Sequence, residues 1–466
     1  MHSTDQTNLQ PDAIPGGPAR AARRGSTWLR AATTLADQGI VSLTTFATIW
    51  LMNRLLGPEM SKVEQGMYGL IYASVWVFAR EILQSLVSTP HTIAVPTKHG
   101  MERRFLNGSS MLHQLVITGL ISAALFVAAG IVRFEGGLDG QTRYAMLLTA
   151  AAAATPPLLL WNFVRIWCFS LRRMQLALVL DVCVSTLTFS GIFLLWHFSM
   201  LRAEWVVVMI GLANLLPVSV VMFIVRREFS FDMKQAQRDA WSNWTTARWL
   251  LGSSMIWACG LYLYPWLITG MRGASDAGIY AFCFTMAGLG NPLLFAVQNW
   301  LGPHIAHAFV ANDGAGFRKY IYKATWGFAL LMTPVALAMA FFAESLLHVI
   351  GRQYVGNGHT VGLLALAMIP QAVSFALSRG LFSMGRASLD LAANITPIVV
   401  FAVVGVILVR HYGPEGAAAS MVLAQLSGAT FRLVAFSRMA VDQKPIEHKE
   451  SVGSGSDNVP MPSDVV

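Results

Sequence analysis

The sequence has 466 residues, of which 55% are hydrophobic and only 12% are charged. A soluble globular domain carries about 25% charged residues, so this composition excludes an ordinary soluble protein and predicts a polytopic membrane protein. The formal net charge of +9 does not call for a nucleic-acid partner, because basic residues at the membrane surfaces account for it.

Two polar tails flank the apolar part of the chain, at residues 1–27 and 439–466. Their composition offers too little apolar surface to drive folding, so we expect two disordered tails. No apolar stretch that could act as a signal peptide precedes Trp28.

The apolar part divides into segments long enough to cross a bilayer, which takes about 20 helical residues. Lipid offers the backbone no hydrogen bonds, so each segment is expected to be a helix. The sequence therefore predicts an all-α fold with about twelve transmembrane helices, at residues 28–56, 68–94, 109–132, 144–169, 176–198, 205–225, 249–270, 278–301, 320–343, 361–384, 389–409 and 416–436.

Lysine and arginine are concentrated in alternate loops, on the side that also carries both termini. The opposite loops, which include Gly136 and Gly356, carry few. Since cytoplasmic loops hold the excess of basic residues, we expect a multi-pass protein of the cytoplasmic (inner) membrane. Both termini should lie in the cytoplasm, with Gly136 and Gly356 outside.

The longest internal connection, residues 227–248, divides the predicted spans six and six. It contains Trp241 and Trp244, and tryptophan is enriched at membrane interfaces. We interpret it as a cytoplasmic interfacial helix between an N-lobe, residues 28–226, and a C-lobe, residues 249–438. An irregular loop with incidental tryptophans is the alternative.

The second predicted span carries Arg80 and Glu81 near its middle. A charge at mid-membrane costs at least ~2.5–3.5 kcal/mol, so both side chains should face protein or water. The helical period places polar residues on one face, namely Arg80, Gln84, Ser88 and His91. This face either lines a pathway or only fixes packing, with Asp37 of the first span as the candidate partner of Arg80. Asp37 is also a candidate coupling-ion site.

The two halves of the chain share short patterns. Arg165 and Arg172 enclose a Phe-Ser pair at the end of the fourth span, as Arg379 and Arg386 do at the end of the tenth. Gly66-Met67-Tyr68-Gly69 likewise corresponds to Gly278-Ile279-Tyr280-Ala281. An internal repeat of parallel topology explains these matches, and chance similarity among apolar helices is the alternative.

Other polar residues of the spans are open to two interpretations. Arg165 and its repeat mate Arg379 either line a cavity or extend to the interface. Asn291 and Gln298 share a face of the eighth span near the position where Arg80 maps in the repeat. The C-lobe is therefore expected to be polar but uncharged there. The alternative is that these amides only bind backbone groups freed by a bend at Pro292.

A family resemblance lies in the first hairpin and in the last connection. Leu35-Ala36-Asp37-Gln38 opens the first span, Arg54-Leu55-Leu56-Gly57-Pro58-Glu59 closes it, and Tyr68-Gly69 opens the second. The last connection reads Arg410-His411-Tyr412-Gly413-Pro414-Glu415-Gly416-Ala417. These patterns resemble the polysaccharide-export branch of the multidrug/oligosaccharidyl-lipid/polysaccharide (MOP) exporter superfamily. Relative to that branch, residues 60–67 look like an insertion.

The resemblance implies a MATE-like transporter with two six-helix lobes around a central cavity. It also implies a lipid-linked glycan as substrate, with cavity arginines holding its pyrophosphate. Further expected partners are the bilayer and the polysaccharide polymerase and glycosyltransferases of the same pathway. No cofactor or metal is expected. Together with the polar faces, the resemblance gives a set of candidate substrate-binding residues: Arg80, Glu81, Gln84, Asp37, Arg54, Arg165, Arg379, Asn291 and Gln298.

We therefore predict a flippase for a polyprenyl-diphosphate-linked oligosaccharide. The first alternative is a cation-coupled multidrug exporter of the same fold, which would hold acidic residues in its cavity. The second is a membrane polysaccharide polymerase or ligase. The chain lacks a P-loop, a His-Glu-x-x-His and a Gly-x-Ser-x-Gly, and its outer loops are short, which favours a transporter over an enzyme.

Overall fold

The computed structural model describes residues 18–439, apart from 96–97, 136–138, 172, 312–313 and 385. These residues form helices and short connections, with no strand among them. The predicted all-α class is confirmed. Large apolar side chains such as Leu120, Phe223 and Leu330 are exposed on outer faces, as expected where lipid is the solvent.

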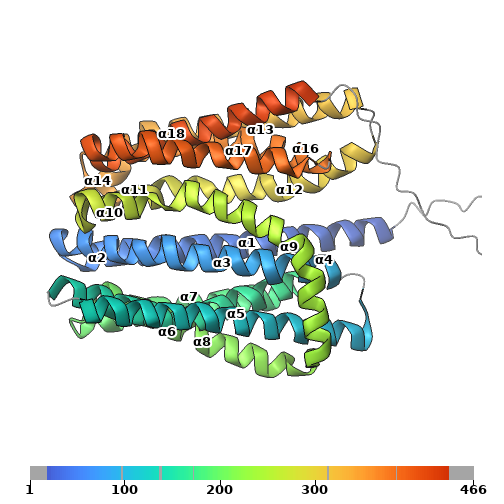
Figure 1. Ribbon diagram of the computed structural model, residues 1–466, viewed down its shortest axis with the longest axis horizontal. Helices are drawn as coiled ribbons and strands as arrows, with labels where there is room; N and C mark the ends of the chain where they lie inside the picture. The colour runs from blue at the N-terminus through green and yellow to red at the C-terminus, as the bar shows by residue number, and fades with distance from the viewer. Residues whose placement is uncertain are drawn as a thin grey trace, which may run out of the picture.

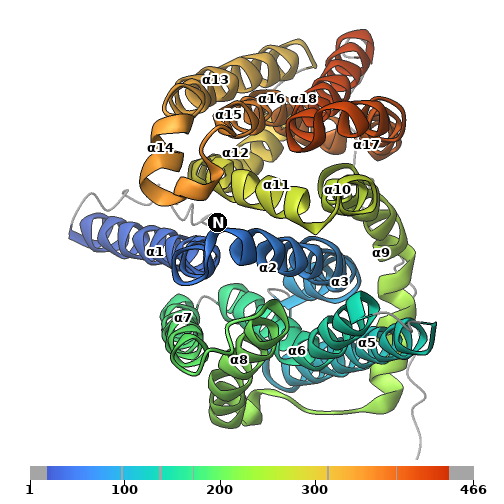
Figure 2. The ribbon, with the colours of Figure 1, turned by 90° about the vertical axis from the view of Figure 1, so that its left-hand side faces the viewer.

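The helices run nearly parallel and gather into two halves (Figure 1). Viewed along the helices, α5–α8 lie at one side and α13–α18 at the other, with α1–α3 and α10–α11 between them (Figure 2). The N-lobe helices are α1 (Pro18–Leu55), α2 (Pro58–Leu70), α3 (Val77–Leu83), α4 (Thr89–Ala94), α5 (Gly100–Glu135), α6 (Asp139–Ser170), α7 (Met174–His197) and α8 (Ala203–Val225).

The C-lobe follows the long helix α9 (Met233–Tyr262). Its helices are α10 (Tyr264–Arg272), α11 (Ala274–Ala287), α12 (Asn291–Ala311), α13 (Gly314–Phe341), α14 (Ala343–Ile350), α15 (Gly358–Leu366), α16 (Met368–Ser383), α17 (Ala387–Val400) and α18 (Val406–Met439).

Nine helical segments in the described part of the chain are long and apolar enough to cross a membrane. Eight match one predicted span each, and the ninth, Ser388–Arg438, contains the last two predicted spans. This ninth segment is kinked at Gly413, whose backbone has φ 58° and ψ −129°, a left-handed conformation that glycine tolerates. The first two predicted spans are also helical, but neither is among the nine.

The second span begins earlier than predicted and is not a single α-helix. It starts at Pro58, so residues 60–67 are its first turns rather than an inserted loop. Two π-helical turns, Ile71–Trp76 and Gln84–Ser88, enclose α3. The second of these turns precedes Pro90, which has no N–H to donate to the preceding turn. Such π turns are frequent at functional sites.

Most of the predicted linker and the first part of the seventh span form one continuous helix, α9, and the rest of that span continues in α10. Asp232 caps it, because its carboxylate accepts hydrogen bonds from the backbone N–H groups of Lys234 and Gln235. The first part of α9 crosses the ends of the N-lobe helices at a steep angle (Figure 1). Trp241 and Trp244 on this part are exposed. The first helix, α1, begins at Pro18, inside the segment predicted as a tail.

The lobes meet at the end that carries α2 and α11. The two repeated motifs lie against each other there: a Cβ on Gly66 would come 2.1 Å from the Ala274 carbonyl oxygen, and one on Gly278 would come 1.9 Å from that of Lys62. Only glycine allows the two backbones to approach so closely. Tyr354 reinforces this contact by donating a hydrogen bond of 2.8 Å to Gln65 Oε1.

Candidate functional site

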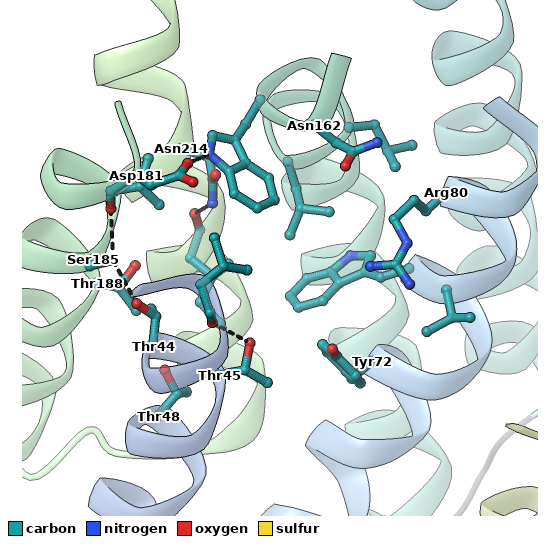
Figure 3. A pocket seen from close by; sticks show the side chains of 18 of the residues that line it. Thr44, Thr45, Thr48, Tyr72, Arg80, Asn162, Asp181, Ser185, Thr188 and Asn214 are labelled. Atoms are coloured by element: carbon teal, nitrogen blue, oxygen red, sulfur yellow. Dashed lines mark hydrogen bonds between the residues drawn. The ribbon is translucent and has the colours of Figure 1, made fainter. Parts of the chain in front are cut away.

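A cavity of about 130 Å³ opens among the N-lobe helices. Its wall comes from α1, the second span, α6, α7 and α8, and it combines aromatic rings, hydroxyls, amides and two charged groups (Figure 3). At roughly 10–15 Å³ per water position, a space of this size holds on the order of ten waters. It can therefore receive a single ring or a small polar group, and a longer molecule would extend beyond it.

The second span contributes Tyr68, Tyr72, Trp76 and Arg80 to the wall, at steps of four residues. The ring centroids of Tyr68 and Tyr72 are 6.2 Å apart, and those of Tyr72 and Trp76 are 6.5 Å apart. In an α-helix four residues rotate by slightly more than one full turn, and in a π-helix they rotate by slightly less. The second span contains both kinds of turn here, so the excess and the shortfall in rotation offset each other and the four side chains stay in one row.

Arg80 ends this row, and its guanidinium points into the cavity (Figure 3). It forms no ion pair and donates no hydrogen bond within the described part of the chain, unlike the buried Arg165 and Arg432. The predicted exclusion of Arg80 from lipid is consistent with this position. An arginine kept without a carboxylate partner is available to an anionic ligand.

Asp37 does not pair with Arg80, so that prediction is wrong. Arg165 Nη2 instead contacts an Asp37 carboxylate oxygen, and Arg165 Nε lies 2.8 Å from an Asp181 oxygen. Trp161 Nε1 donates a 2.8 Å hydrogen bond to the other Asp181 oxygen. Asp37 lies near Asp181 rather than near Arg80 because α1 packs against α7. This packing brings the two aspartates together on the side of the cavity away from Arg80.

This cluster of Arg165, Asp37 and Asp181 has two carboxylates and one guanidinium. Asp37 is fully buried, and its second oxygen has no hydrogen-bond partner in the described residues. Asp181 forms part of the cavity wall. Arg165 therefore holds carboxylates rather than lining the cavity, and its removal would leave two buried acids uncompensated, which costs about 3–5 kcal/mol for one broken pair.

The remaining candidates are not brought together with Arg80. Gln84 lies in a π turn and donates to Thr89 Oγ1 at 3.3 Å, while Ser88 and His91 are buried elsewhere. Of the predicted polar face of the second span, only Arg80 lines this cavity. Glu81 is half-buried, and no carboxylate–arginine pair includes it within the described residues.

Four candidates outside the second span also lie away from the cavity wall. Arg54 is exposed in the last turn of α1. Arg379 is exposed too, with its Cζ 5.1 Å from the centre of the Phe375 ring, so its surroundings differ from those of its repeat mate Arg165. Asn291 and Gln298 lie on α12, after a 3-10 turn at Gly288–Gly290.

Two buried charged clusters escaped the sequence prediction. In the C-lobe, Arg432 Nε lies 2.7 Å from Asp390, and Arg432 also donates to Asn394. The C-lobe therefore contains a buried ion pair. This pair lies on α17 and α18, away from the α12 position that was predicted to be uncharged. The signal was an Asp and an Asn four residues apart in an apolar span. In the N-lobe, Arg143 lies 2.7 Å from Glu64 and 3.5 Å from Glu204.

No known protein-family profile matches the chain. The probable low-salt glycan biosynthesis flippase Agl15 of Haloferax volcanii is 22% identical over 175 residues. That alignment covers 36% of this chain and 37% of the relative. Among solved structures, an inward-facing MATE family multidrug resistance transporter of the MOP superfamily has a TM-score of 0.68 at 13% identity, covering 88% of this chain and 94% of that one.

The chain has the MATE fold. Two further structures support this: an outward-facing MATE transporter with a TM-score of 0.62 at 14% identity, and a MOP superfamily transporter from Pyrococcus furiosus with a TM-score of 0.59 at 12% identity. Each covers 88% of this chain and 95% of its own. The MOP resemblance seen in the first hairpin is thereby confirmed for the fold.

The close contact of Gly66 with Gly278 joins the lobes at the end predicted to face outward. The described part of the chain has no group of three or more His, Cys, Asp or Glu residues that could hold a metal ion.

Proposed function

We propose that this MATE-fold protein is a flippase for a polyprenyl-diphosphate-linked oligosaccharide. The observation that carries the proposal is Arg80, which stands in the cavity wall without a carboxylate partner among the described residues. The partial similarity to a glycan biosynthesis flippase supports the choice of substrate.

The charge of the substrate explains why such an arginine is needed. A diphosphate cannot cross hydrocarbon unpaired, because burying an isolated charge is strongly penalised. The planar guanidinium binds two phosphate oxygens at once. Rocking of one lobe against the other would then expose the Arg80 site to each leaflet in turn.

This proposal places the protein in the cytoplasmic membrane, with both termini inside. It would receive its substrate from the glycosyltransferases of the pathway and deliver it to the polymerase. The relatives that share its fold are transporters, and the matched relative is a flippase, which supports a transporter rather than a membrane polymerase or ligase.

A second candidate function, a cation-coupled multidrug exporter, is favoured by one observation. Asp181 in the cavity wall and Asp37 behind it share a single arginine. The excess carboxylate is the acidic feature expected of an exporter cavity. The two functions differ in cargo, an anionic lipid against a small organic cation.

Reconstitution of the purified protein into liposomes separates these functions. We expect flipping of a fluorescent short-chain polyprenyl diphosphate that carries N-acetylglucosamine, measured by quenching of the outer leaflet. Transport of ethidium under a proton or sodium gradient, without lipid flipping, would instead establish the exporter. Empty liposomes and boiled protein are the controls.

The orientation can be tested with single cysteines in a chain whose four native cysteines are replaced. Gly136 lies outside the described residues, and Gly356 has φ 94°, so its neighbour Val355 is the better outer position. We expect an impermeant maleimide to label Val355→Cys in intact cells, and to label Lys234→Cys on α9 only after permeabilisation. The reverse pattern would invert the topology.

A further inference from the structure

The cavity wall opposite the aromatic row is rich in groups that bind hydroxyls. Thr44, Thr45 and Thr48 of α1 face Ser185 and Thr188 of α7 on that side, across from Tyr72 and Arg80 (Figure 3). Thr44 Oγ1 lies 2.6 Å from Ser185 Oγ. The cavity thus has an aromatic side and a hydroxyl side, with Arg80 at the end of the aromatic row.

Two polar atoms of this wall are buried and lack a hydrogen-bond partner among the described residues. One is a donor, Trp76 Nε1, on a side chain only 4% exposed, and the other is an acceptor, Asn214 Oδ1, on a residue 3% exposed. The Asn214 amide is oriented by its Nδ2, which donates to the Ile210 carbonyl at 2.7 Å. Buried polar atoms are nearly always satisfied, so each exception needs an explanation.

Because the two atoms are themselves buried, a ligand in the cavity would reach them after the Trp76 and Asn214 side chains rotate toward it, and a ligand that both donates and accepts hydrogen bonds would then satisfy both. Sugar hydroxyls do so, and the C–H face of a sugar ring is apolar and carries partial positive charge. Such a face stacks on the electron-rich face of an aromatic ring. Hydroxyl partners on one side and aromatic rings on the other therefore match a pyranose lying between them.

We propose that Tyr72 and Trp76 form a subsite for a sugar ring of the lipid-linked glycan, beside Arg80. The proposal rests on the function proposed above, because it takes the diphosphate to be held by Arg80. Arg80 lies about one helical turn from Trp76. With the diphosphate at Arg80, the sugar nearest to it would therefore lie beside the aromatic row. The subsite would make the protein distinguish a glycosylated carrier from a bare one.

Binding of two probes tests the subsite. The first is farnesyl diphosphate linked to N-acetylglucosamine, whose C–H face is common to hexoses, and the second is farnesyl diphosphate alone. We expect the purified wild-type protein to bind the first roughly 3- to 10-fold more tightly per stacked ring. Trp76→Leu and Tyr72→Leu should each reduce that ratio while leaving the Kd of the bare diphosphate unchanged.

The controls keep folding and function apart. Trp76→Phe retains a ring and should retain most of the ratio, and Trp326→Leu removes a tryptophan that is 57% exposed on α13 and should change nothing. An unchanged Kd for the bare diphosphate shows that a variant is folded. If both leucine variants keep the wild-type preference for the glycosylated probe, the sugar subsite is wrong, but the proposed flippase function is unaffected. Failure of the wild type to bind either probe overturns both.

Discussion

Replacing Arg80 by alanine should abolish flipping of a polyprenyl-diphosphate glycan in proteoliposomes while the protein still accumulates in the membrane. The guanidinium forms no salt bridge in the described residues, so its loss breaks no ion pair. What is lost is the contact with phosphate. Two charge-assisted hydrogen bonds of about 1.5–3 kcal/mol each correspond to an affinity decrease of at least ~100-fold. Arg80→Lys keeps the positive charge but loses the planar guanidinium that binds two phosphate oxygens at once, so it should retain flipping only in part.

Arg165→Ala is the matched control, because it removes an arginine of the same lobe that does have partners. It should reduce the amount of folded protein and its melting temperature, since Asp37 and Asp181 lose their common cation. Arg379→Ala, at an exposed arginine, should change neither. Full flipping by a well-expressed Arg80→Ala variant would remove Arg80 from the substrate site.

The features that the sequence predicted correctly depend on local properties. Length and hydropathy located the spans, because lipid imposes both on every segment. The same local argument singled out Arg80, since a charge inside an apolar span must face protein or water. The structure places that residue in a cavity wall.

The features that the sequence did not predict depend on the packing of distant segments. Asp37 and Arg165 are 128 residues apart, and only the packing of α1 against α7 brings Asp37 and Asp181 to the same guanidinium. His91 packs against α5, where its Nε2 lies 3.0 Å from Asn107 Oδ1, a contact between distant segments that the period of the second span alone could not indicate. The repeat motifs are visible in the sequence, but no feature of either motif indicates that Gly66 and Gly278 lie in contact.

Gly66→Val should prevent closure of the lobes at the end where α2 meets α11, and thereby stop transport. The new Cβ would lie 2.1 Å from the Ala274 carbonyl oxygen, a backbone atom that cannot turn aside as a flexible side chain could. Overpacking of this kind costs about 1–3 kcal/mol, which shifts the equilibrium between the closed and open states of this end by roughly 5- to 160-fold. A transporter held open at one end cannot complete alternating exposure.

A cross-link across the same contact reports whether it closes. Gln353 Nε2 lies 3.0 Å from Ser61 Oγ. Because a cysteine side chain is shorter than that of glutamine, cysteines placed at these two positions, with the native cysteines replaced, should be joined by a short bifunctional maleimide in the otherwise unchanged protein. Adding Gly66→Val should abolish that cross-link, whereas Gly119→Val should not, because nothing lies within 4 Å of a Cβ at Gly119. If the Gly66→Val protein still cross-links and still flips its substrate, contact between the two glycines is not required for closure, and this end must close through the hydrogen bonds of Gln65, Tyr354 and their neighbours.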